Sequence, residues 1–73
     1  MNEETIFPPA NDPNFIRVLI MTPLGDAGIK AHIVRTNNNF DVTPDQKVPE
    51  ELMSNIRMSV VDRGYTIKFL PHD

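Results

Sequence analysis

The sequence predicts a small α+β domain, in which one helix packs on an antiparallel sheet of three or four strands. Three observations carry this prediction. Apolar residues, many of them β-branched, fill 14–22; apolar and polar residues alternate over 29–35; and apolar residues recur at helical spacing over 49–63. A chain of 73 residues is short enough to be a single domain.

Residues 1–13 are expected to form a flexible N-terminal arm, and the domain is expected to occupy 14–73. Three prolines in this stretch lack backbone donors and oppose both helix and sheet. Phe7 is the one aromatic residue of the arm. Two interpretations stay open: a loose arm with a single hydrophobic contact, or a peptide-like arm that docks on a partner through Phe7.

The first strand is predicted over 14–22, with apolar residues on both of its faces. A half-exposed strand normally alternates apolar and polar residues, so this strand is either covered on both sides or has a face that awaits a partner. One face carries Ile16, Val18 and Ile20, and the other carries Phe15, Leu19 and Met21, with Arg17 among them.

A hairpin is predicted to follow, with a glycine-containing turn at 23–28 and a second strand over 29–35. The apolar residues of the second strand point inward in this arrangement, leaving His32 outside. The asparagines of 36–39 favour another turn, and residues 40–42 are expected to form a short third strand.

Residues 49–63 are predicted to form the helix, because Pro49 suits its first position and Glu50 and Glu51 complement its dipole. Gly64 lies where a glycine C-cap belongs. The last strand is expected over 65–70, before a proline. Four apolar residues share one face of the helix, while two point away from it: Leu52, Met53, Ile56 and Val60 on the first, Met58 and Val61 on the second.

Composition argues against catalysis, metal binding and membrane insertion. The chain has no cysteine, and its two histidines, His32 and His72, lack the paired spacing of a zinc site. No stretch approaches the roughly 20 apolar residues of a membrane helix, and the acidic start does not resemble a signal peptide. We therefore expect a cytoplasmic protein without catalytic activity, cofactor or metal.

Binding of another macromolecule is the function that remains. The net charge is −3, yet basic groups gather on the predicted sheet and helix. We expect a non-catalytic, protein-binding regulator with two apolar anchors and four polar contacts. These are Phe7 and Phe15, then Arg17, Lys30, His32 and Arg35.

Two alternatives use much the same surface. A single-stranded nucleic acid could contact the basic residues of the outward sheet face, Lys68 included, and stack on Phe15. A homodimer could instead bury the second face of the first strand. The net negative charge disfavours the nucleic acid.

In its size, its asparagine-rich turn, its acidic arm and its lack of catalytic residues, the chain resembles small phage-encoded host-takeover proteins. It is similar in particular to those that bind the host's RNA polymerase and inhibit or redirect it. This resemblance implies that the partner is a segment of a polymerase subunit, that the effect is on transcription, and that the protein works in the host cytoplasm.

Overall fold

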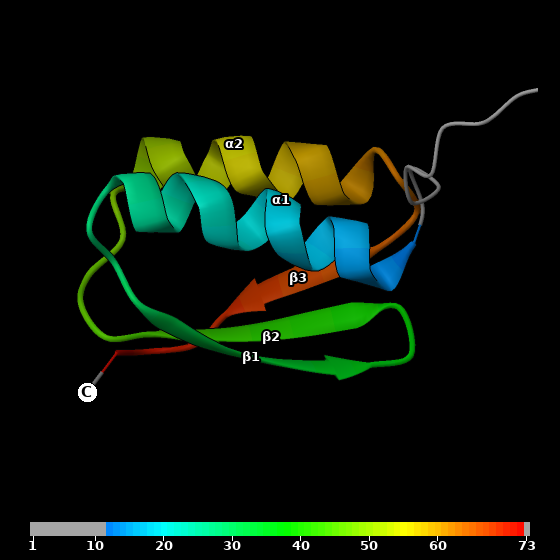
Figure 1. The fold of residues 1–73 in the computed structure, drawn as a ribbon, viewed down its shortest axis with the longest axis horizontal. Coiled ribbons are helices and arrows are strands. Elements are labelled where there is room, and N and C mark those ends of the chain that lie inside the picture. Colours follow the sequence, from blue (N-terminus) through cyan, green and yellow to red (C-terminus); the bar gives the residue numbers. More distant parts are fainter. Residues whose placement is uncertain (1–11, 73) are drawn as a thin grey trace, which may run out of the picture.

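The computed structural model describes residues 12–72 and arranges them in two layers, with helices over one face of a sheet (Figure 1). The elements follow the order α1 (Pro13–Asp26), β1 (Ala31–Thr36), β2 (Asn39–Pro44), α2 (Glu50–Val61) and β3 (Thr66–Phe69). The predicted α+β class is confirmed. The described residues contain two helices rather than one, and their three-stranded sheet is mixed rather than antiparallel.

Helix α1 occupies the segment in which the sequence predicted the first strand, so the prediction for 14–22 is wrong. The Asp12 carboxylate starts the helix, because its Oδ1 accepts a hydrogen bond from the Asn14 amide at 2.7 Å. Pro13 takes the first helical position, where a missing N–H costs nothing. Two residues that the sequence assigned to the arm therefore begin the domain. The arm itself, with Phe7, lies outside the described residues.

The apolar residues of α1 follow a helical period, which explains the error. An apolar run fits a buried strand and a buried helix equally well by periodicity. Three residues spaced four apart are completely buried: Ile16, Ile20 and Leu24. Phe15 and Leu19 pack against the same core and are half-buried, whereas Val18 and Met21 are exposed. The chain therefore covers for itself most of the apolar surface that the sequence left without a partner.

Both helices end at a glycine in the left-handed region, Gly28 with φ 77° and Gly64 with φ 87°. After α1, the Ile29 amide donates to the Leu24 carbonyl at 2.9 Å, and an equivalent bond closes over Gly64 after α2. The prediction that Gly64 closes the helix is confirmed by its positive φ, although the C-cap residue itself is Asp62. The predicted turn at 23–28 is wrong over its first four residues, which continue α1.

The sheet has the order β1-β2-β3, with β2 in the middle. Strands β1 and β2 are antiparallel and meet at a turn in which Asn37 has φ 56°, so the asparagine turn and the strand at 40–42 are confirmed. The hairpin is β1–β2, and not the predicted pair of 14–22 with 29–35. Strand β3 is parallel to β2, because α2 carries the chain back across the sheet between them.

One face of the sheet is covered by the helices and the other is open. On the covered face, Phe40 and Val42 of β2 are completely buried, and the Phe40 ring lies 5.6 Å from that of Tyr65. The buried face of α2 agrees with the prediction, since Ile56 and Val60 are buried. The open face carries mostly polar side chains: His32, Val34 and Thr36 of β1, Asn39, Asp41 and Thr43 of β2, and Thr66 and Lys68 of β3.

Candidate functional site

Four of the residues that the sequence singled out for binding lie on one side of the molecule. Arg17 projects from α1, and its Nη1 donates to the carbonyl of Ile33 in β1 at 3.4 Å. Lys30 immediately precedes β1, and His32 and Arg35 belong to it. All four are exposed. The fold thus gathers along β1 a group of residues that the sequence had placed on two different strands, 14–22 and 29–35.

The two arginines of this group have local hydrogen bonds, and none of the four side chains has an acidic partner within residues 12–72. The Arg35 Nη1 donates to the Asn37 carbonyl at 2.8 Å, and the Lys30 amide, not its ammonium group, donates to Asp45 Oδ1 at 3.1 Å. Within residues 12–72, none of the four side chains forms an ion pair with a carboxylate. The positive charges of Arg17, Lys30 and Arg35 therefore remain available to a ligand.

The backbone of β1 offers unpaired groups along the same line. The Asp45 amide donates to the Lys30 carbonyl at 2.8 Å, which makes these two residues a hydrogen-bonded pair of the antiparallel ladder. Such pairs alternate with non-hydrogen-bonded ones, so the even-numbered residues of β1 bond to β2. The odd-numbered residues direct their N–H and C=O groups to the open edge: Ala31, Ile33 and Arg35.

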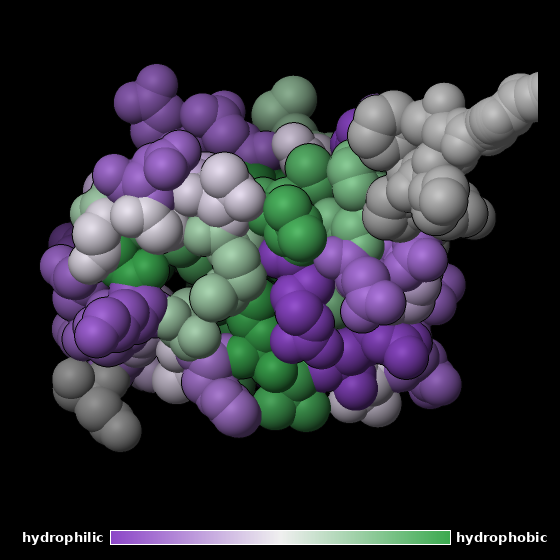
Figure 2. Space-filling model, in the orientation of Figure 1, coloured by the Kyte–Doolittle hydropathy of each residue, from purple (hydrophilic) through white to green (hydrophobic). Residues whose placement is uncertain are grey.

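Exposed apolar side chains also occur on α1 and β1, the two elements that carry or adjoin these basic groups. Val18 and Val34 are about half exposed, at 55% and 48%, and Met21 is exposed at 39%. Figure 2 shows this side of the molecule, where apolar side chains form a band from the helix layer toward the sheet, bordered by hydrophilic groups. We call this region the β1-edge surface. It comprises Arg17, Val18, Met21, Lys30, His32, Ile33, Val34 and Arg35.

Phe15 lies apart from this surface. Its ring is half-buried against the core, and the guanidinium carbon of Arg63 lies 5.8 Å from the ring centroid. Lys68 also lies elsewhere, on the open sheet face in β3. Phe15 and Lys68 therefore do not share with Arg17 the outward sheet face that the sequence had suggested.

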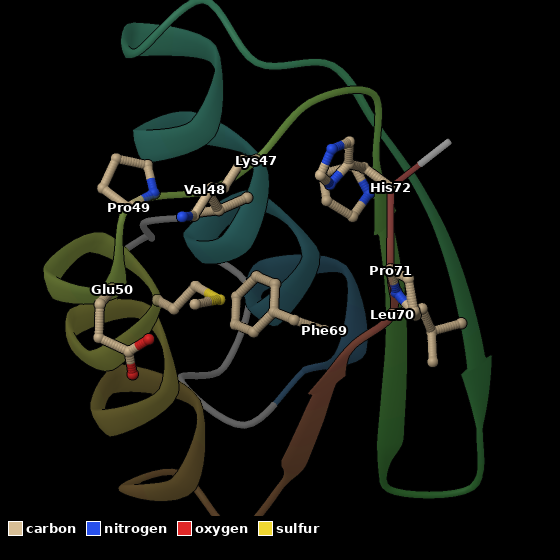
Figure 3. A pocket seen from close by; sticks show the side chains of 10 residues that line it. Lys47, Val48, Pro49, Glu50, Phe69, Leu70, Pro71 and His72 are labelled. Carbon is tan, nitrogen blue, oxygen red and sulfur yellow. The ribbon is translucent and has the colours of Figure 1, made fainter.

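A second surface, which the sequence reasoning missed, is a groove between the start of α2 and the end of β3. It encloses about 540 Å³ and is lined mainly by apolar residues. Figure 3 shows Phe69 pointing toward the first turn of α2 and Leu70 pointing away from it. Three prolines that flank the strands and helix here, Pro44, Pro49 and Pro71, were the available signal. Its charged residues, Lys47 and Glu50, have opposite signs, so the groove selects no particular charge.

Potential metal ligands do not cluster in the described part of the chain. Residues 12–72 contain no cluster of three or more histidine, aspartate or glutamate side chains that could hold a metal ion. Neither helix has the length and apolar character needed to cross a bilayer, as far as the described residues go.

No protein-family model matches this sequence, and searches of the curated proteins and of the solved structures find no significant match. The geometry of the β1-edge surface is therefore the basis on which a function can be inferred.

Proposed function

We propose that this chain is a non-catalytic, protein-binding regulator and that the β1-edge surface is its partner site. The observation that supports this most is that β1 and the adjoining part of α1 combine three features: basic side chains without acidic partners within residues 12–72, exposed apolar side chains, and outward-facing backbone groups of β1. Charge favours an acidic partner, since arginine and lysine pair well with carboxylates. The apolar side chains add contact area that water would otherwise cover.

A host RNA polymerase subunit is the first partner to test, because the chain resembles phage-encoded proteins that bind this enzyme. The experiment is capture of proteins from a nuclease-treated bacterial lysate, followed by titration with purified RNA polymerase. We expect one protein to be retained in stoichiometric amount. Its affinity should fall only moderately as salt rises, because apolar contacts contribute to binding. If no protein is retained at either step, the proposal fails.

Binding of single-stranded nucleic acid is the second candidate, since phosphates would also pair with the four basic groups. The position of Phe15 argues against it, because stacking on bases needs an open aromatic face and this ring is half-buried with Arg63 over it. Salt separates the two candidates. Affinity for nucleic acid should fall steeply as salt rises, since counterions are released on binding.

A further inference from the structure

We infer that the β1-edge surface binds an extended, acidic segment of its partner as an added antiparallel strand. This inference rests on the proposed function and specifies how the partner is held. Strand addition requires a sheet edge with unpaired backbone groups. The edge of β1 presents those of Ala31 and Arg35 and the N–H of Ile33, while the Ile33 carbonyl accepts a bond from Arg17. Strand β1 contains no proline, so each of these three residues has a backbone donor as well as an acceptor.

Arg17 marks the point at which the incoming strand would bond. Its guanidinium group donates to the outward-facing Ile33 carbonyl across 3.4 Å, which is long for a hydrogen bond between nitrogen and oxygen. A backbone N–H of the partner can take over this carbonyl. The arginine is then released to pair with a carboxylate of the same partner segment, so that the edge exchanges one weak bond for a ladder bond and an ion pair.

The alternation of side chains along a strand defines which partner residues should be acidic. In an antiparallel pair, a residue opposite Ile33 would exchange both backbone bonds with it and project its side chain to the same, helix-covered side. Arg17 reaches the edge from that side, and Arg35 has the same parity as Ile33. The partner residues whose N–H groups bond to β1 should therefore be the acidic ones.

The residues between them would project to the open face of the sheet. There they would meet Val34, together with Lys30 and His32 near the start of the strand. An apolar residue suits the position beside Val34. The segment that fits this edge is thus an alternation of acidic and apolar or β-branched residues.

A second copy of the chain fits this edge less well. Two β1 strands paired around Ile33 would bring the two Arg17 groups, each held at that residue, beside one another. Like charges in such positions are destabilising. A nucleic acid lacks the alternating N–H and C=O groups that would complete the strand edge.

Synthetic peptides test the inference on the unmodified protein. The probe is an acetylated and amidated eight-residue peptide in which glutamate alternates with valine, labelled for fluorescence anisotropy. Two modified peptides carry N-methyl groups either on all glutamates or on all valines. N-methylation of the glutamates should weaken binding by at least about tenfold, because it removes the donors that face β1. N-methylation of the valines should change it by less than about twofold, and a lysine–valine peptide should not bind.

Equal effects of the two methylated sets, whether both harmless or both harmful, would overturn strand addition. If the unmodified peptide does not bind, although the protein retains a partner from lysate, this inference fails and the proposed function stands. If nothing is retained from lysate, the proposed function fails by itself. Sedimentation of the protein alone should show a monomer. A dimer that the peptide cannot dissociate, or displacement of the peptide by an oligothymidylate, would assign the edge to another occupant and overturn the inference.

Discussion

The two outer edges of the sheet differ in length, charge and surroundings, although the same core supports both. Strand β1 has six residues and presents three of them to solvent through the backbone, beside basic groups on β1 and α1. Strand β3 has four residues, and Pro71 follows within two residues of its end. The Thr66 amide donates to the carbonyl of Asn38, just before β2, and the Leu70 amide donates to Val42 of β2. Of the β3 residues, Ile67 and Phe69 therefore direct their backbone groups outward.

This comparison shows why an edge strand alone does not define a binding site. The edge of β3 lies under α2, where the guanidinium group of Arg57 covers the Phe69 ring at 5.9 Å. A short strand that ends before a proline offers a partner little to pair with. The edge of β1 is longer, and within residues 12–72 the Arg17 guanidinium is the one group that hydrogen-bonds to its outward-facing backbone. We therefore assign partner binding to the edge of β1, and variants near the edge of β3 serve as controls.

The largest expected effect comes from proline substitutions that separate the two sides of β1. Val34→Pro removes a donor to β2 and should lower the free energy of unfolding by about 3 kcal/mol or more. Ile33→Pro removes a donor that faces the open edge, a position at which proline is tolerated. It also removes a half-buried side chain. The loss of unfolding free energy in Ile33→Pro should be smaller than that in Val34→Pro by at least about 1 kcal/mol. Urea unfolding measures both, and equal losses would show that the strand is paired in the opposite register.

Phe15→Ala sharpens the distinction between packing and binding. Because the ring is half-buried beneath Arg63, its removal should lower the free energy of unfolding by about 2 kcal/mol, less than for a fully buried phenylalanine. Met58→Ala, at a side chain that is 68% exposed on α2, should stay within about 0.5 kcal/mol of the wild type. Thermal unfolding checks both. A stable Phe15→Ala variant with poor partner binding would return Phe15 to the binding surface.

Charge reversal compares the two edges directly. The double variant Arg17→Glu/Arg35→Glu should weaken partner binding by at least about tenfold, because it opposes acidic groups with acidic groups. The matched variant Arg57→Glu/Lys68→Glu changes the same number of charges near β3 and should have an effect of less than about threefold. Titration of the captured partner gives both values. Similar losses for the two variants would mean that net charge, and not the β1 edge, determines affinity.

The smallest effect is expected from the exposed apolar residues. Val18→Ser should weaken partner binding by about threefold through the loss of buried apolar area, without a measurable change in stability. Met58→Ser on α2 is its control, since this side chain lies outside the β1-edge surface. Isothermal titration of both variants makes the comparison. A larger loss for Met58→Ser would move the interface to α2.

Local signals in the sequence were enough to predict the elements that follow α1, though not how the strands pair. The proline, the paired glutamates and the closing glycine define α2, and the alternation of side chains defines β1. Helix α1 was missed because its apolar residues suit either period. The decisive signals were the cap at Asp12–Pro13 and the pair Gly28–Ile29, in which the amide of Ile29 bonds back to Leu24.

In the candidate site, too, some features could be predicted from the sequence and others could not. Arg17, Lys30, His32 and Arg35 were named from the sequence, and they lie along one edge even though the strand proposed for Arg17 is a helix. This happens because α1 lies beside β1, close enough for Arg17 to reach the Ile33 carbonyl. The direction of the β1 backbone groups and the groove at the end of β3 depend on pairing between distant segments. The three prolines that flank the groove were a local signal for it, but no local pattern of residues encodes the direction of the β1 backbone groups.

Amide hydrogen exchange in the free protein and in the partner complex tests the central claim most directly. In the free protein, the amides of Ala31, Ile33 and Arg35 should exchange rapidly, while those of His32 and Val34 should be protected by β2. Binding should slow the exchange of the three odd-numbered amides and leave Ile67 and Phe69 unchanged. A saturated complex in which Ala31, Ile33 and Arg35 still exchange as in the free protein would contradict the claim that the partner pairs with β1.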